Sequence, residues 1–175
     1  MTWTLGMLSA ALAGTAPVGL VGGATLVAGP PSLGGGTAAR LWIDLDVIGL
    51  EAGLREALVT SDPRLVGTVF FGLRRMIGRS AYVRVGFAHH HESDWDLLGT
   101  DLGGALFGVA PGIVHRSGAE LGGGLVWPFT GTQIEDRAGI VGDLAVAWMP
   151  DLTRPNVYTF LETSLIVWVG PRPEE

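Results

Sequence analysis

The segment from His89 to Asp96 carries most of the side chains that could do chemistry. It reads His-His-His-Glu-Ser-Asp-Trp-Asp and follows an alternating run of apolar residues. Neighbouring side chains of an extended chain point to opposite faces, so His89, His91 and Ser93 would share one face. An imidazole can take the proton of a serine hydroxyl, and a carboxylate can orient that imidazole. The spacing therefore allows a hydrolase site with His91 as base, Ser93 as nucleophile, and an acid from Asp96, Asp101 or Glu120.

The same segment allows metal binding as an alternative. His89 and His91 stand two residues apart on one predicted strand, so both imidazoles could reach one ion, completed by Glu92, Asp94 or His115. A third interpretation assigns no chemistry, because histidines and carboxylates at a solvated strand end can simply pair with each other. No cofactor is expected. The run of glycines at 122–124 could be mistaken for a phosphate-binding loop, but it is not followed suitably by the Lys and Ser/Thr that such a loop needs.

Composition narrows the class of protein. The chain has 175 residues, which predicts a single domain over 1–175. Apolar residues make up 47% and charged residues 16%. The charged fraction is below the roughly 25% of soluble domains. The chain is also too apolar for a disordered segment, which is polar and highly charged. The absence of cysteine excludes disulfides and thiol nucleophiles. The net charge is −6 and all eleven cations are arginines without a basic stripe, so nucleic acid is not an expected partner.

Alternation with period two is the main structural signal and predicts β-strands. It is clear in 41–48, 65–74, 81–90, 140–148 and 157–169, and the Gly-rich segments 101–114 and 118–129 fit strands less regularly. Turn-like sequences separate these runs at 61–63, 77–80, 111–112 or 116–118, 131–136 and 150–156. Leu50 to Leu58 has a helical pattern, and we expect either a loop helix or the far end of a long strand.

The N-terminal segment 1–37 is uncharged, and Arg40 is the first charged residue of the chain. Its many glycines disfavour a membrane helix, because each costs about 1 kcal/mol relative to alanine. We therefore predict a hairpin of two strands near 2–14 and 17–29, with a hydrophobic helix or an uncleaved leader as the alternative.

The two faces of the predicted strands differ in composition. One face is aliphatic, whereas the other is rich in Gly, Ala, Thr and aromatic residues with isolated charges of both signs. That second face suits a narrow barrel interior, where buried charges must be paired. The charges predicted to face the interior are Asp44, Asp46, Arg74, Arg84, Asp143 and Glu162. Tryptophans near strand ends would form aromatic belts at a membrane interface, namely Trp3, Trp42, Trp127, Trp148 and Trp168.

These features resemble the small bacterial outer-membrane β-barrels. The resemblance implies an all-β, antiparallel, transmembrane up-and-down barrel that crosses the outer membrane and contacts membrane lipid. Nine strand candidates are present, while single-chain bacterial barrels have an even number, so we expect about eight strands, with ten as the alternative. Four predicted turns separate the strand that carries His91 from the last strand. His91 would therefore lie on the same side of the membrane as the end of the last strand.

A narrower resemblance rests on two residues. The His-x-Ser spacing of His91 and Ser93 is similar to that of the outer-membrane lipid A deacylases, which implies His91 as base and Ser93 as nucleophile. The chain departs from that pattern at Asp94, where the family usually has Asn.

Three functions are consistent with the sequence. The leading prediction is a structural, anchoring or assembly role without catalysis, and no wide pore, because side chains just fill an eight-stranded interior. The alternatives are a lipid-directed esterase using His91 and Ser93, and a soluble β-barrel that binds an apolar ligand. The sequence leaves any protein partner or larger assembly open.

Overall fold

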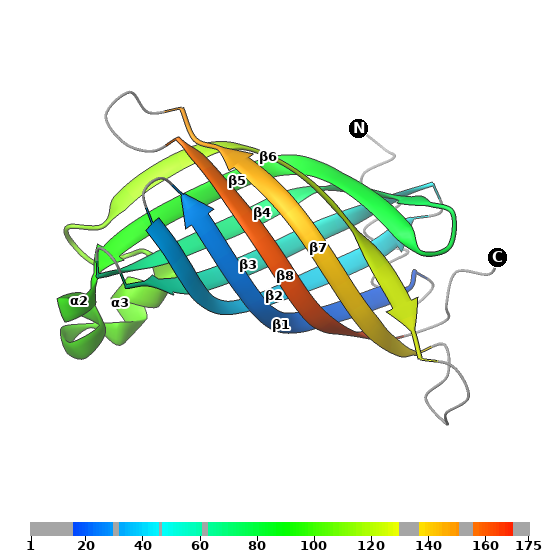
Figure 1. Cartoon of the computed structure of the whole chain (residues 1–175), viewed down its shortest axis with the longest axis horizontal. Helices are drawn as coiled ribbons and strands as arrows, with labels where there is room; N and C mark the ends of the chain where they lie inside the picture. Colours follow the sequence, from blue (N-terminus) through cyan, green and yellow to red (C-terminus); the bar gives the residue numbers. More distant parts are fainter. Residues whose placement is uncertain are drawn as a thin grey trace.

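The computed structural model describes residues 16–29, 32–45, 47–60, 63–129, 137–150 and 156–169. Within them, eight antiparallel strands close into one barrel in chain order, and two short helices lie at one end (Figure 1). The strands are β1 (Val18–Gly29), β2 (Ser32–Leu45), β3 (Ile48–Val59), β4 (Arg64–Ile77), β5 (Ala81–Asp94), β6 (Val114–Pro128), β7 (Ala138–Trp148) and β8 (Val157–Val169). The helices are α2 (Trp95–Thr100) and α3 (Leu102–Phe107).

Closure of the barrel removes every free sheet edge. Each strand pairs with its neighbours in the chain, and β1 pairs with β8, so that Val18 lies opposite Val169. The strands have 11 to 15 residues and run obliquely to the long axis (Figure 1). A tilted strand of about 9–11 residues is long enough to cross a bilayer. The all-β, up-and-down barrel of eight strands predicted from the sequence is confirmed, and ten strands is wrong.

The structure decides two local predictions. Residues 101–114, expected as a strand, contain α3 and the loop that leads into β6. Of the two alternatives for Leu50 to Leu58, the loop helix is wrong, because the segment is extended and lies within β3. Segment 2–14 lies outside the described residues. The other predicted strand of that hairpin, 17–29, corresponds to β1, which pairs with β2 and β8. None of the described helices is long and apolar enough to cross a membrane.

The two ends of the barrel are distinct. We call the end that carries α2 and α3 the helix end, and the end where β1 begins and β8 finishes the far end (Figure 1). Three connections separate β5 from β8, so β5 finishes at the helix end and β8 at the far end. The predicted side of His91 is therefore wrong, because 101–114 was counted as a strand.

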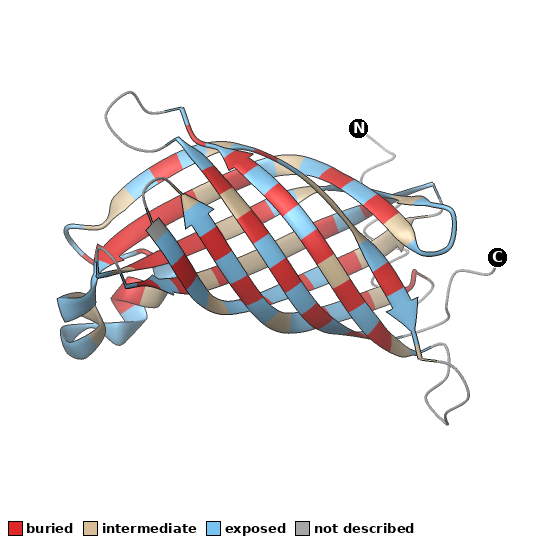
Figure 2. Ribbon diagram, viewed as in Figure 1, coloured by how far each residue is buried: buried red, intermediate tan, exposed pale blue. Residues whose placement is uncertain are grey.

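The outer wall of the barrel is apolar. Buried and exposed residues alternate along each strand (Figure 2). Aliphatic and aromatic side chains occupy the exposed positions, among them Leu20, Leu73, Val85, Phe87, Leu121, Leu144, Val146, Leu161 and Leu165. A soluble barrel would bury these side chains and hydrate the other face, which is the reverse of the observed arrangement.

The interior holds ion-paired charges. At the centre, Arg84 contacts Asp143 at 2.8 Å (Nη2 to Oδ1) and Glu120. Arg55 contacts Glu120 at 2.7 Å (Nη1 to Oε2) and also Glu162. Arg40 lies between Glu51, Asp143 and Glu162 at 3.3–3.4 Å. Nearer the far end, Arg74 pairs with Asp44.

Five of the six predicted interior charges take part in these pairs, and the sixth, Asp46, lies outside the described residues. Arg40 was not predicted, because the strand expected at 41–48 does not include the half of β2 that carries it. Glu51 and Arg55 were not predicted, because the segment that carries them has a helical pattern.

The tryptophans divide between the two faces. Trp127 and Trp148 point outward near opposite ends of the barrel and are 50% and 54% exposed, as an interfacial belt requires. Trp42 is fully buried instead. Its ring contacts Tyr82 edge-on at 5.1 Å between centroids and lies 4.1 Å from the Arg74 guanidinium carbon. Trp168 packs against Trp42 from the interior side, and Trp3 lies outside the described residues.

The interior network predicts a large stability cost for the loss of one arginine. Arg84→Met leaves Asp143 and Glu120 partly uncompensated, and breaking a buried ion pair costs about 3–5 kcal/mol. Arg75→Gln is the matched control, because Arg75 is exposed on the outer wall of β4. Arg84→Met should lower the free energy of unfolding by at least about 2 kcal/mol more than Arg75→Gln does. Urea titration of both variants in detergent micelles measures this difference. Equal effects would contradict the interior network.

Candidate functional site

Helices α2 and α3 form a cap on the outer wall at the helix end. The Asp101 carboxylate accepts the backbone N–H of Gly104 at 2.9 Å and starts α3. Gly108 ends the helix in the left-handed region at φ 66°. Gly104 and Ala105 are buried, and the main chain of Ala105 is hydrogen-bonded to the imidazole of His91. The cap therefore covers side chains of β5 that would otherwise point outward.

His91 is the best-enclosed of these side chains. It lies between Gly67 on β4, directly opposite in the register, and Gly108 beyond α3. A Cβ at Gly108 would lie 2.9 Å from the ring carbon Cγ of His91. Nε2 of His91 lies 3.6 Å from Oε1 of Glu56, a β3 residue. We call Glu56, His91 and Ser93 the capped cluster.

The capped cluster differs from the predicted hydrolase site. Ser93 is buried under the cap, and its hydroxyl has no hydrogen-bond partner among the described residues. Asp96, the expected acid, is exposed in α2, and the structure describes no hydrogen bond or ion pair between its carboxylate and His91. Asp101 caps α3, and Glu120 lies in the barrel interior. The carboxylate placed beside His91 is that of Glu56.

A second group of polar side chains lies next to the capped cluster on the outer wall. Nε2 of His89 lies 3.1 Å from Nδ1 of His115, and Nδ1 of His89 lies 3.0 Å from the Ser117 hydroxyl. The two imidazole rings are 5.2 Å apart and nearly parallel. Among the described residues, no group of three or more His, Asp or Glu could hold a metal ion. The two histidines predicted to share a metal ion have different partners in the structure: His89 faces His115 on β6, whereas Nε2 of His91 faces Glu56.

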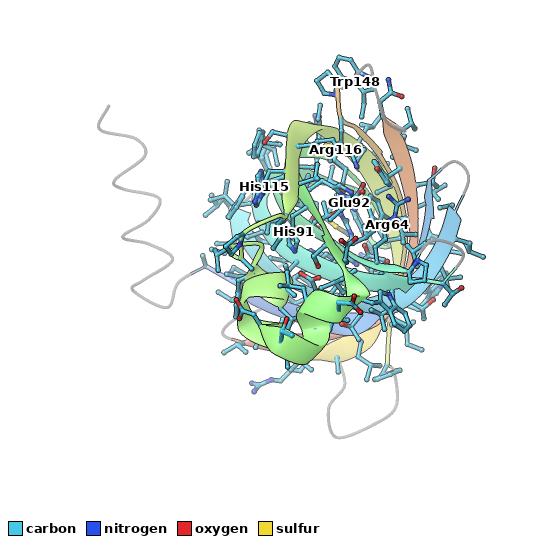
Figure 3. All side chains as sticks on the ribbon, turned by 90° about the vertical axis from the view of Figure 1, so that its left-hand side faces the viewer. Arg64, His91, Glu92, His115, Arg116 and Trp148 are labelled. Atoms are coloured by element: carbon cyan, nitrogen blue, oxygen red, sulfur yellow. The ribbon has the colours of Figure 1, made fainter. Side chains whose placement is uncertain are left out.

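A third polar group fills the mouth of the barrel at the helix end, where Figure 3 labels Arg64, Glu92 and Arg116. Glu92 accepts from Arg64 at 2.8 Å and from the Tyr158 hydroxyl at 2.7 Å, and it also pairs with Arg116. His90 lies 3.2 Å from the same carboxylate. Glu92 points to the interior, so it is not available to complete an outer metal site with His89 and His91.

Glu56 is the site residue that the sequence analysis missed. It lies in Leu50 to Leu58, whose pattern looked helical, so its face could not be assigned. Once the segment is a strand, alternation places Glu56 on the outer wall with Leu54 and Leu58, opposite Gly67. An isolated acidic residue in an outward aliphatic row was the signal that could have identified it.

Comparison of the sequence with protein-family models and with curated proteins gives no significant match. Solved structures resemble the fold. Neisserial surface protein A superposes with a TM-score of 0.62 at 11% identity, covering 87% of this chain and 96% of that one. The N-terminal β-barrel domain of Pseudomonas aeruginosa OprF gives 0.59 at 12% identity, covering 87% and 97%. Ail, the attachment invasion locus protein of Yersinia pestis, gives 0.53 at 10%, covering 88% and 99%. This chain therefore has the fold of small outer-membrane barrels.

The enclosure of His91 makes the cap sensitive to one methyl group. A Cβ at Gly67 would overlap the His91 ring and lie 2.8 Å from Oε1 of Glu56. Gly67→Ala should therefore displace His91 and loosen the cap, measured as faster hydrogen exchange of residues 95–110. Gly103→Ala is the control, since a Cβ there meets nothing within 4 Å. Unchanged exchange in Gly67→Ala would refute the enclosure of His91 between β4 and the cap.

Proposed function

We propose that this chain is an integral outer-membrane β-barrel with a structural or anchoring role, and that it does not conduct ions or solutes. The observation that carries the proposal is the inverted arrangement of the barrel, with an aliphatic outer wall around an ion-paired interior. The aliphatic side chains of the outer wall can contact the hydrocarbon of a bilayer. Because the sheet is closed, no strand edge leaves unpaired backbone N–H and C=O groups in lipid. The likeness to outer-membrane barrels of known structure supports the location.

Two grooves on the outer wall favour a lipid environment. One, of about 270 Å³, is lined by Leu41, Ile43, Leu50, Ala52 and Phe71 among others. The second, of about 160 Å³, includes Leu73, Val83, Val85 and Leu121, with Arg75 at its side. Grooves of this kind fit acyl chains, and an arginine beside one can pair with a lipid phosphate.

The interior argues against conduction. The central ion pairs link β2, β3, β5, β6, β7 and β8 across the barrel, from Arg40, Arg55 and Arg84 to their carboxylates. Phe70 and Phe160 stack against Arg84 and Arg55 at 4.6 Å. An ion passing through would have to break several buried pairs, each of which is costly to break.

Arginine scanning of the outer wall tests the membrane proposal. Leu144→Arg, in the middle of β7, should lower the free energy of unfolding in lipid vesicles by about 2–4 kcal/mol. Val157→Arg, at the rim on β8, should lower it by about 0–1 kcal/mol. Both side chains are exposed, at 55% and 41%, so a soluble barrel would tolerate both changes equally. A monodisperse, folded protein purified without detergent would also contradict the proposal.

A second candidate function, a lipid-directed esterase, is favoured by the position of Glu56. Its carboxylate lies 3.6 Å from Nε2 of His91, where it could orient the imidazole while Ser93 follows two residues later on the same face. His91 would take the proton of the Ser93 hydroxyl as its oxygen attacks an ester carbonyl. His91 then gives that proton to the departing alcohol, and a water that His91 deprotonates attacks the acyl-serine, releases the fatty acid and restores the Ser93 hydroxyl. Because His91 and Ser93 are buried, substrate access requires the cap to move.

Ester hydrolysis by protein in detergent, with lipid A or a short acyl ester as substrate, tests this candidate. Ser93→Ala and Glu56→Gln should each lower the rate by about a hundredfold or more, whereas Asp96→Asn should leave it unchanged. An inactive wild type, or equal rates for wild type and Ser93→Ala, would dismiss the esterase without affecting the membrane proposal.

A further inference from the structure

The histidines on the outer wall of β5 and β6 form a pair that does not belong to the capped cluster. His89 and His115 are accessible at the surface, whereas His91 is enclosed between Gly67 and the cap. The rings of His91 and His115 are 6.4 Å apart, and Nε2 of His91 faces Glu56 instead. The surface pair therefore needs its own explanation.

We propose that His89 and His115 form a two-histidine site for a divalent transition-metal ion of the zinc, nickel or copper class. Nε2 of His89 and Nδ1 of His115 are 3.1 Å apart. Two metal–nitrogen bonds of about 2.0–2.1 Å at a tetrahedral angle separate their nitrogens by about 3.3 Å. At the right angle of a square-planar ion the separation is about 2.9 Å. The observed separation lies between these values, so an ion fits with small ring movements.

The surroundings of His89 suit a metal ligand. Nδ1 of His89 lies 3.0 Å from the Ser117 hydroxyl. When Nδ1–H donates to that oxygen, the lone pair is fixed on Nε2, the atom that faces His115. A hydrogen bond on the far nitrogen of a ligating histidine is the usual support for such sites. Ser117 is therefore the positioning residue of the site.

Cross-strand placement adds rigidity. His89 lies directly opposite Ser117, and His91 directly opposite His115, in the β5–β6 register. His89 and His115 are therefore diagonal neighbours on two strands of a closed barrel. With two protein ligands, the remaining coordination positions stay open to water or to an anionic oxygen. Imidazole ligands select zinc, copper and nickel over calcium and magnesium, which prefer oxygen.

Equilibrium dialysis with metal analysis tests the site in detergent-solubilised full-length protein that lacks a polyhistidine tag. We expect about one equivalent of Zn²⁺, Ni²⁺ or Cu²⁺ and no comparable uptake of Mg²⁺ or Ca²⁺. His89→Gln and His115→Gln should each weaken binding by more than tenfold, and Ser117→Ala by about tenfold. Because all three side chains are at the surface, these variants should fold.

His91→Gln is the matched histidine control and should leave metal affinity within about twofold of wild type, because His91 is not a ligand in this site. Three results would overturn the proposal: no uptake by the wild type, undiminished uptake by His89→Gln or His115→Gln, or a loss in His91→Gln as large as theirs. None of these measurements depends on whether the barrel spans a membrane or hydrolyses esters.

Discussion

Ion pairs inside the barrel hold its strands together and allow its outer wall to be apolar. Arg40, Arg55 and Arg84 are almost fully buried, and each contacts at least two carboxylates. Burying a charge without a partner in a medium of low dielectric would carry a large free-energy cost, because the charge loses its hydration. The pairs join strands from opposite sides of the barrel, so they fill its centre and hold its shape. With the charges enclosed, the outer wall can be almost entirely apolar.

Closure and alternation then divide the remaining residues between two environments. Each outward position must suit a wall of aliphatic side chains, and most do. Apart from Arg75 on β4 toward the far end, the charged and imidazole exceptions gather on β3, β5 and β6 toward the helix end. There Glu56, His89, His91 and His115 interrupt the aliphatic rows. The α2–α3 cap covers part of this polar patch and leaves His89 and His115 accessible. The chemistry available on the outer wall is thus concentrated beside the largest described connection of the barrel.

Much of the fold could be predicted because alternation reports the environment of each face. The strands β4, β5, β7 and β8 could be predicted because Val, Leu and Phe form a row on one face of each. The segments that were not recognised as strands lack this contrast between their two faces. The first half of β2 is Gly- and Ala-rich, so neither face stands out, and the spacing of Leu50, Leu54 and Leu58 fits a helix as well as a strand.

The candidate site was predictable only in part. His91 and Ser93 were placed on one face by alternation, which is a local property. The carboxylate beside His91 depends on strand register, because Glu56 and His91 lie on either side of Gly67 in the β3–β4 and β4–β5 pairings. The cap also follows from tertiary structure, since its helices are only six residues long and isolated helices of that length are unstable. Sequence separation therefore decided which contacts were missed.

The orientation of the outer wall toward lipid can be measured directly, because the chain contains no cysteine. Single cysteines at Leu144 and Leu165 can carry nitroxide spin labels in protein reconstituted into lipid vesicles. Both residues are outward on the middle of the wall. We expect both labels to collide mainly with oxygen, which concentrates in hydrocarbon, and little with a water-soluble nickel chelate. Labels that collide freely with the nickel chelate at both positions would contradict a wall that faces lipid.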